Sequence, residues 1–208
     1  MNAQTLRLTL TGAAGAIEAV RDDPAGASRG VVVIAHPHPL FAGTMDNKVV
    51  QTIARAFVQC GFSAVRFNFR GVGASAGMHD EGRGECDDLL AVVRQVAAHG
   101  EPLALAGFSF GAFVTSHAVQ ALWPERPPVR LVLVGTAAAR FHVAPLPDEA
   151  RDRALVVHGE LDDTVPLSAV MDWARPQSLP VTVIPGGGHF FHGQLPLLKS
   201  LVVRHLAA

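Results

Sequence analysis

The sequence has few cysteines, no excess of charge of either sign and no long apolar run. Its two cysteines, Cys60 and Cys86, cannot form the disulfide framework of a small secreted domain. Lys plus Arg total 17 and Asp plus Glu total 18, so we expect no surface for nucleic acid or anionic lipid. No apolar run reaches the roughly 18 residues that a membrane span needs. Since residues 1–15 lack a signal-peptide pattern, we expect a cytoplasmic protein.

What is present is enough apolar sequence for a large core. The chain has 208 residues, of which 49% are hydrophobic and 17% charged, a balance that excludes a disordered chain. No repeat, low-complexity tract or linker divides it, so the sequence predicts a single domain over residues 1–208.

Apolar stretches of strand length alternate with stretches of helix length. The expected strands are Leu6–Leu10, Ala16–Val20, Val31–Ala35, Ala64–Phe69, Leu103–Phe108, Val129–Gly135, Ala154–His158 and Val181–Ile184. The expected helices are Asn47–Cys60, Glu85–His99, Gly111–Leu122, Leu167–Trp173 and Gln194–Ala207. After an antiparallel start, this order predicts an α/β fold with a mostly parallel twisted sheet and helices on both faces. Ligands of such sheets bind in the loops at the carboxyl ends of the strands.

Two segments match the pattern Gly-x-Ser-x-Gly, one around Ser75 and one around Ser109. Ser109 ends an apolar strand and opens an apolar helix, which is the strand–turn–helix context of a nucleophile elbow. The free N–H groups at the helix start would face an oxyanion, and the N–H of Phe110 is the natural first donor. Ser75 lies in a glycine-rich stretch that we interpret as a loop. The alternative for Ser109 is a helix-capping serine in a tight turn.

A serine nucleophile needs a base, and the base needs an acid that orients it. In this architecture the acid and then the histidine follow later strands. The acid position holds Asp162 and Asp163, and the spacing favours Asp162, with Asp163 as a helix cap. The histidine position holds His189 and His192. We favour His189, because it follows a glycine run that lets the loop reach Ser109, and we expect His192 to start the last helix.

The loop after Val31–Ala35 supplies the second oxyanion donor in such folds. It reads His36-Pro37-His38-Pro39-Leu40, and proline has no N–H to donate. The candidates are therefore His38 and Leu40, of which position favours His38. The alternative is a stiff turn without a catalytic role.

These motifs resemble the α/β-hydrolase superfamily. Within it, the chain from Val31 onward looks like small lidless bacterial hydrolases described as dienelactone-hydrolase-like or as predicted esterases. The resemblance rests on the segments 36–39, 43–48, 67–73, 107–112 and 189–192. It implies an α/β-hydrolase fold and a Ser-Asp-His triad. Two departures matter: dienelactone hydrolases carry Cys where this chain has Ser109, and Pro37 stands where glycine is usual.

The surroundings of the expected site are short and apolar. The segment Thr136–Arg153 is too short for a helical cap, so we expect an open site. We expect Leu40, Phe108 and Phe190 to bind substrate, within a set of aromatic side chains that could line the site and that also includes Phe41, Phe110, Phe141 and Phe191. Arg70 either braces loops, through Asp80, Glu81 or Glu85, or binds a substrate carboxylate.

The sequence predicts a serine hydrolase that cleaves a short or medium carboxylic ester or thioester through an acyl-enzyme. A peptidase or amidase with the same residues, and a binding protein with an idle triad, are the alternatives. We expect a small-molecule substrate, no cofactor and no metal, although His36, His38, His189 and His192 could in principle converge on an ion. The oligomeric state, monomer or homodimer, stays open.

Overall fold

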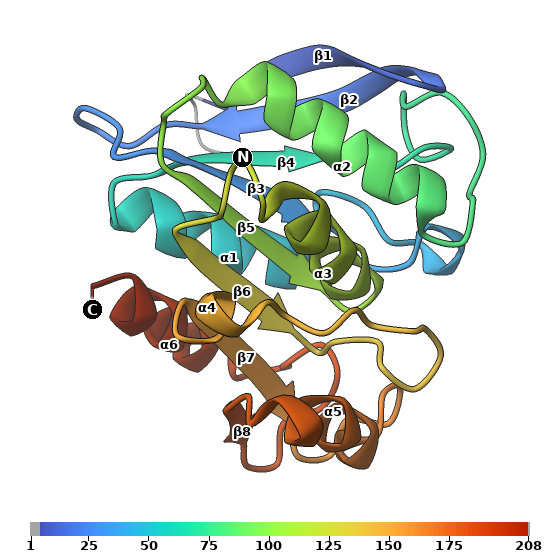
Figure 1. Ribbon diagram of the computed structural model, residues 1–208, viewed down its shortest axis with the longest axis vertical. Helices are drawn as coiled ribbons and strands as arrows, with labels where there is room; N and C mark the ends of the chain where they lie inside the picture. The colour runs from blue at the N-terminus through green and yellow to red at the C-terminus, as the bar shows by residue number, and fades with distance from the viewer. Residues whose placement is uncertain (1–4, 208) are drawn as a thin grey trace.

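The computed structural model describes residues 5–207, whose centre is one eight-stranded sheet in the order β1-β2-β4-β3-β5-β6-β7-β8 (Figure 1). The strands are β1 (Leu6–Gly12), β2 (Gly15–Asp22), β3 (Val31–Ala35), β4 (Ser63–Phe67), β5 (Leu103–Phe108), β6 (Arg130–Val134), β7 (Ala154–Gly159) and β8 (Val181–Ile184). β2 runs antiparallel to both β1 and β4, and the six strands from β4 to β8 across the sheet are parallel. The expected mostly parallel sheet with an antiparallel start is confirmed.

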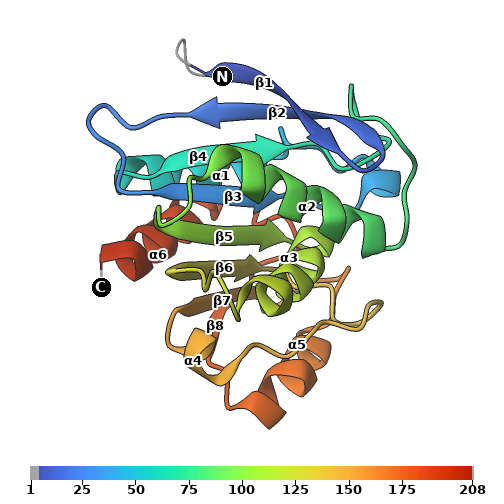
Figure 2. The same ribbon diagram turned by 45° about the horizontal axis from the view of Figure 1, so that its top comes forward.

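Helices cover both faces of the sheet. They are α1 (Lys48–Gln59), α2 (Arg83–Val96), α3 (Phe110–Leu122), α4 (Asp148–Arg151), α5 (Leu167–Ala174) and α6 (Leu195–Ala207), with short 3₁₀ turns η1 (Pro39–Phe41) and η2 (Arg175–Gln177). Figures 1 and 2 show α2, α3 and α5 on one face and α1 and α6 on the other. No helix among residues 5–207 is long and apolar enough to cross a membrane.

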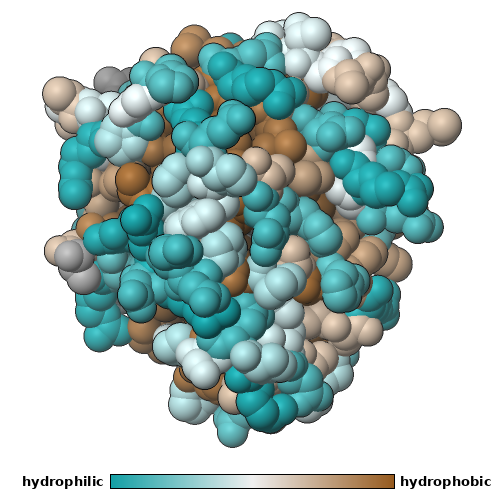
Figure 3. All heavy atoms as spheres, in the orientation of Figure 1, coloured by the Kyte–Doolittle hydropathy of each residue, from teal (hydrophilic) through white to brown (hydrophobic). Residues whose placement is uncertain are grey.

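Burial on both faces explains the continuous apolar strands. Every residue of β3 and of β5 is buried, and alternate side chains enter two separate hydrophobic clusters. One cluster lies under α2 and α3 and the other under α1 and α6. Parallel strands covered on both faces are expected to lack polar alternation. Figure 3 shows the face of the molecule that carries α2 and α3, and its surface is mostly hydrophilic with smaller hydrophobic patches.

Several boundaries differ from the expected ones by a few residues, and those of β4, α2 and α6 have local reasons. β4 ends at Phe67 rather than Phe69, because the Phe69 N–H donates to His36 Nε2 (3.0 Å) while its apolar ring continues into the core. α2 ends at Val96 and starts at Arg83, where its polar first turn is held by the Glu85 side chain, which accepts the Gly82 N–H (2.8 Å). α6 starts at Leu195, so His192 lies in the preceding turn and does not begin the helix. The one-turn α4 is too short for apolar periodicity to predict.

The turn from β5 into α3 brings the start of the helix into close contact with the backbone of β5 and of β3. A Cβ atom on Gly107 would lie 2.4 Å from the Gly111 carbonyl oxygen, and one on Gly111 would lie 2.3 Å from the Ala35 carbonyl oxygen. Both glycines are therefore required by close backbone approach. Ser109 lies between them at the carboxyl edge of the sheet.

We predict that Gly111→Ala lowers the free energy of unfolding by about 1–3 kcal/mol, because its methyl group overlaps backbone that cannot move aside. Urea unfolding followed by circular dichroism measures this. The matched control is Gly26→Ala, whose added Cβ has nothing within 4 Å, and it should change the free energy by less than about 1 kcal/mol. Equal unfolding midpoints for the two variants would contradict the steric explanation.

Candidate active site

Ser109 is the junction between β5 and α3. It is 7% exposed, with φ 56° and ψ −115°, a left-handed conformation that is costly for a residue with a side chain. Its N–H donates to the Val134 carbonyl (2.8 Å), and its carbonyl accepts from Ala112 and Phe113 in the first turn of α3. Strand and helix therefore hold the strained turn from both sides, and the hydroxyl lies above the sheet edge.

The loops after β7 and β8 bring an imidazole and a carboxylate to this hydroxyl. His189 Nε2 lies 3.0 Å from Ser109 Oγ, and His189 Nδ1 lies 2.7 Å from Asp162 Oδ2. His189 and Asp162 are both buried. The three side chains form one hydrogen-bonded chain from carboxylate to hydroxyl, in the order that a serine nucleophile needs. The exposed His192 has no part in it.

Of the two adjacent aspartates, only Asp162 points inward. Its Oδ1 accepts the N–H groups of Val165 (2.7 Å) and Thr164 (3.0 Å). Burial acts to raise the pKa of Asp162, but the hydrogen bonds from His189 and Val165 outweigh it and the pKa is lowered. The ionised form is thus favoured. Asp163 is exposed and contacts only the Thr164 hydroxyl (3.3 Å) among the described residues, so it does not cap α5.

His158, at the end of β7, is a part of the site that sequence reasoning missed. Its Nε2 donates to the Val165 carbonyl (2.9 Å) and lies 3.5 Å from Asp162 Oδ2. The side chain is fully buried, and burial lowers its pKa, which favours the neutral ring. It fixes the turn that carries Asp162. A histidine placed directly before the acid loop was the available signal.

Two phenylalanines contact the His189 ring from different sides. Phe190, whose ring centroid lies 5.1 Å from that of His189, is 44% exposed and borders the site. Phe108 lies 5.0 Å away but is 0% exposed, so the expectation that it binds substrate directly is wrong for this structure. Its ring belongs to the core beneath the imidazole, because side chains alternate along β5 and that of Phe108 points to the α1 and α6 face.

The loop after β3 and the start of α3 each have a backbone N–H without a partner among the described residues. The N–H of Leu40 donates to His38 Nδ1 (3.2 Å) and is therefore occupied. Within residues 5–207, neither the N–H of His38 nor that of Phe110 donates a hydrogen bond. The His38 and Phe110 rings are in contact, with centroids 4.8 Å apart. The side chain of Leu40 is 70% exposed at the rim.

His36 anchors this loop to the neighbouring one. Its Nδ1 donates to the Pro37 carbonyl (2.6 Å), and its Nε2 accepts the Phe69 N–H (3.0 Å). Both ring nitrogens are used, so His36 is not a free metal ligand. Within residues 5–207, no group of three or more His, Cys, Asp or Glu side chains is arranged to hold a metal ion. Burial lowers the pKa of His36 to about 4.

Arg70 and Ser75, at the border of the glycine-rich loop 71–82 and within it, have structural contacts. Arg70 forms a two-pronged ion pair with Asp88 of α2 (2.9 and 2.8 Å), which raises the pKa of Arg70. It therefore braces loops, as one of the two interpretations held, but through Asp88 rather than Asp80, Glu81 or Glu85. Ser75 accepts from Glu18 N–H and donates to the Asn68 carbonyl, so the interpretation as a loop serine is confirmed.

Exposed apolar side chains gather around the site. Of the seven exposed large hydrophobic residues in the described range 5–207, five lie in the loops after β3, β4, β7 and β8, namely Leu40, Phe41, Met78, Leu161 and Phe190. The segment Thr136–Arg153 carries only the one-turn α4 and no helical lid. The mouth of the site is thus open and rimmed by apolar groups.

This geometry agrees with comparisons with known proteins. Residues 26–147, more than half of the chain, match the family model Hydrolase_4, described as serine aminopeptidase, S33. The chain belongs to this family of α/β-hydrolases. The matched residues include Ser109 and end before Asp162 and His189.

Three proteins of similar sequence, two of them with solved structures, agree with this assignment. A Xanthomonas campestris protein described as an α/β serine hydrolase without lid is 35% identical, with a TM-score of 0.88 over 100% of this chain and 95% of that one. An α/β serine hydrolase homologue from Coxiella burnetii is 37% identical, with a TM-score of 0.81 over 97% of both chains. An uncharacterised protein of Rickettsia prowazekii (strain Madrid E) is 30% identical, over 77% of this chain and 71% of that protein. The expected α/β-hydrolase fold without a cap is confirmed for this hydrolase.

We predict that His36 makes the stability of this α/β-hydrolase fall in mild acid. The pKa of His36 is about 4 in the folded state against an ordinary 6.5. Below pH 6.5 the unfolded chain therefore binds a proton that the folded one does not, and the free energy of unfolding should fall by about 3 kcal/mol towards pH 4. His36→Gln, which keeps an acceptor for the Phe69 N–H, should show a smaller fall.

Urea unfolding at pH 7, 6, 5 and 4 measures this dependence. The control is His99→Gln, which changes an exposed histidine and should keep the wild-type slope. Parallel pH profiles for His36→Gln and the wild type would refute the assignment.

Proposed function

We propose that this protein is a serine hydrolase that cleaves carboxylic esters or thioesters of short to medium acyl chain, with Ser109, His189 and Asp162 as its catalytic triad. The observation that carries the proposal is the continuous chain of hydrogen bonds from Asp162 Oδ2 through His189 to Ser109 Oγ. Metal-ion catalysis, hydride transfer and phosphoryl transfer do not need a hydroxyl, an imidazole and a carboxylate in this order.

In the first half-reaction, Ser109 Oγ attacks the carbonyl carbon of the substrate and its proton passes to His189 Nε2. Asp162, ionised because its pKa is lowered, accepts the Nδ1–H and stabilises the imidazolium. The tetrahedral intermediate then collapses. The bond to the alcohol or thiol breaks, the leaving group takes the proton from His189, and an acyl-Ser109 ester remains.

In the second half-reaction, water attacks the acyl-enzyme from the side that the leaving group has vacated. His189 Nε2 takes a proton from this water, and a second tetrahedral intermediate forms. When it collapses, Ser109 Oγ regains the proton and the carboxylic acid leaves. The open mouth, without a lid over residues 136–153, lets water enter without a conformational step.

The N–H groups of Phe110 and His38 form the oxyanion hole of the proposed enzyme. Both are free of other partners within residues 5–207, whereas the Leu40 N–H is occupied. Pro37 and Pro39, on either side of His38, each have a φ fixed by the proline ring, which stiffens the loop. His36 also ties the loop to the backbone N–H of Phe69. A donor held before the reaction begins loses little energy to reorganisation.

The apolar rim favours a small acyl chain. Leu40 and Phe190 project from the loops on opposite sides of Ser109, and both are exposed. Contiguous exposed apolar groups around a catalytic centre are typical of a binding surface. Because no cap encloses the site, this rim is the surface that binds the chain, and a long acyl chain would extend into water.

An amidase or peptidase activity is the second candidate, because the matching family is described as serine aminopeptidase. The same triad serves either bond. The buried carboxylates among the described residues, Glu85, Asp88 and Asp162, already accept hydrogen bonds, so none is free to pair with a peptide amino group, and this ranks peptide cleavage below ester cleavage.

We predict that Ser109→Ala abolishes hydrolysis of p-nitrophenyl acetate and butyrate, with a fall in kcat/KM of at least about 10⁴-fold. The matched control is Ser75→Ala, which changes the serine of the other Gly-x-Ser-x-Gly segment and should keep most of the activity. Labelling by a fluorophosphonate probe should follow the same pattern. Failure of the wild type to label at Ser109 would identify an idle triad and reject the proposal.

The two aspartates provide a second matched pair within this experiment. Asp162→Asn removes the acceptor of the His189 Nδ1–H and should cost on the order of 10³–10⁴ in kcat. Asp163→Asn, at an exposed position, should cost less than about twofold. Similar losses in both variants would contradict the assignment of the acid.

We predict that the enzyme prefers an ester to an amide of the same acyl group. The measurement compares kcat/KM for p-nitrophenyl butyrate with that for butyryl p-nitroanilide, and for alanine p-nitroanilide as an aminopeptidase substrate. A ratio in favour of the ester of more than about 10³ is expected, since the anilide is the poorer leaving group and His189 supplies the same proton to both substrates. Faster cleavage of alanine p-nitroanilide would establish the aminopeptidase instead.

A further inference from the structure

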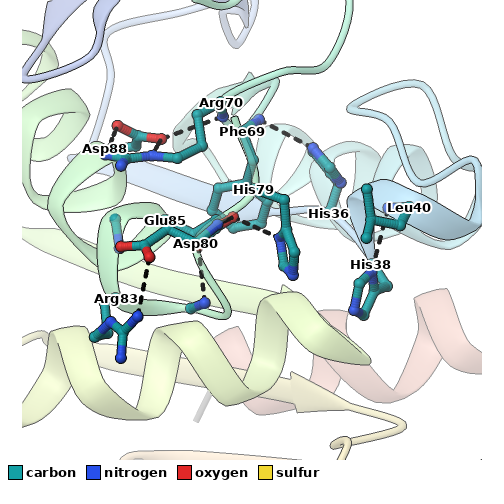
Figure 4. Close-up of polar contacts among 12 residues, drawn as sticks. His36, His38, Leu40, Phe69, Arg70, His79, Asp80, Arg83, Glu85 and Asp88 are labelled. Carbon is teal, nitrogen blue, oxygen red and sulfur yellow. Dashed lines mark hydrogen bonds and ion pairs between the residues drawn. The ribbon is translucent and has the colours of Figure 1, made fainter. Parts of the chain in front are cut away.

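A second histidine–carboxylate pair lies next to the proposed oxyanion hole. His79, in the loop between β4 and α2, has its Nδ1 2.7 Å from Oε1 of Glu85 in the first turn of α2. Figure 4 shows Glu85 on one side of His79 and His38 on the other, with both imidazole rings above α3. Neither His79 nor Glu85 has a part in the steps proposed above.

The direction of the hydrogen bond in this pair follows from the contacts of Glu85. Its side chain is 0% exposed and accepts the N–H groups of Asp80 (3.0 Å) and Gly82 (2.8 Å) as well as the contact from His79. Because Glu85 already accepts two backbone N–H groups and a carboxylate oxygen is an acceptor, the 2.7 Å contact is satisfied when the ring nitrogen of His79 is the donor. His79 Nδ1 therefore carries the proton and donates it to Glu85, which fixes the ring and directs Nε2 away from Glu85.

His79 Nε2 has no hydrogen-bond partner within residues 5–207. The ring lies with its centroid 4.8 Å from that of His38 and 5.5 Å from that of Phe110, the two residues whose N–H groups form the proposed oxyanion hole. The side chain is 13% exposed, so Nε2 can be reached by a small molecule. A fixed polar group without a partner, next to a reaction centre, is a candidate for ligand recognition.

The position of His79 determines which part of a substrate it meets. The leaving group must lie at His189 Nε2, because that atom gives it a proton. The rings in contact with His189 are Phe108 and Phe190, whereas His79 contacts His38 and Phe110. His79 thus lies beside the residues of the proposed oxyanion hole and makes no ring contact with His189, Phe108 or Phe190, which border the leaving group. The part of the substrate that reaches His79 is therefore the acyl chain.

We propose that His79 Nε2 is a subsite for a hydroxyl group on the acyl chain, so that hydroxyacyl esters are the preferred substrates. This inference rests on the function proposed above. Nε2 accepts a hydrogen bond when the ring is neutral and donates one when it is charged, and a hydroxyl can serve either state. A purely aliphatic chain leaves Nε2 unpaired, which costs binding free energy.

The test compares esters that differ only at the acyl chain. The kcat/KM values of ethyl 2-hydroxybutyrate and ethyl 3-hydroxybutyrate are each divided by that of ethyl butyrate, with ethyl 3-methoxybutyrate as an analogue that cannot donate. The wild type should prefer at least one hydroxy ester over butyrate by about three- to tenfold, the effect of one hydrogen bond. Because each ratio is internal to one variant, a general loss of activity cancels.

Two substitutions of His79 separate recognition from structure. His79→Asn keeps an amide near the position of Nδ1, where it can still donate to Glu85, but removes Nε2, so the preference for the hydroxy ester should disappear. His79→Gln places an amide near the position of Nε2 and should retain part of the preference. His99→Asn, an exposed control, should keep the wild-type ratio.

Each outcome decides a different statement. Loss of the preference in His79→Asn, with partial rescue in His79→Gln, supports the subsite. Hydrolysis of ethyl butyrate with no hydroxyl preference in the wild type, or with the same preference in His79→Asn, overturns the subsite and leaves the proposed function intact. Failure of the wild type to hydrolyse any ester or to label at Ser109 overturns the proposed function and the subsite together.

Discussion

The hydrogen bond between Ser109 Oγ and His189 Nε2 joins residues 80 positions apart in the chain, and the rest of the site depends on it. A hydrogen bond of 3.0 Å tolerates only small displacements of either partner. The strands that carry the three loops must therefore keep their register. β5, β6, β7 and β8 pair in parallel without a break, so the ends of β5, β7 and β8 lie along one edge. The packed core below this edge makes the register stable.

Two of the proposed catalytic side chains, those of Ser109 and Asp162, are held by backbone contacts as well as by their side-chain partners. Ser109 is fixed by the sharp turn between β5 and α3, and Asp162 by the N–H groups of Thr164 and Val165. His158 reinforces the second turn from within the core through the Val165 carbonyl. On the other side of Ser109, His36 holds the loop of His38 against Phe69. Buried neutral histidines thus stabilise loops on both sides of the nucleophile.

Much of this could be predicted from the sequence because the signals were local. Strand-length apolar runs, the glycines around Ser109 and the order of serine, acid and histidine each depend on few neighbouring residues. The misassigned features depend on distant partners. Nothing near Phe69 shows that its N–H meets His36, and nothing near Arg70 shows that its partner is Asp88, one helical turn beyond Glu85. Phe108 looked accessible because it precedes Ser109, but strand alternation points its ring into the core.

The His79–Glu85 pair could not be predicted from the sequence, because it too depends on the fold. In the sequence the two residues lie six positions apart in a glycine-rich loop and the helix that follows it, where a histidine and a glutamate are ordinary surface residues. The fold buries Glu85 completely and uses it to cap α2, so the carboxylate needs donors from the loop. His79 donates to Glu85 through Nδ1. The other ring nitrogen of His79, Nε2, then has no partner among residues 5–207. An open, lidless hydrolase has little apolar enclosure with which to select a substrate. In the proposed enzyme, His79, fixed beside the proposed oxyanion donors, is therefore the main means by which this site would distinguish one short acyl chain from another.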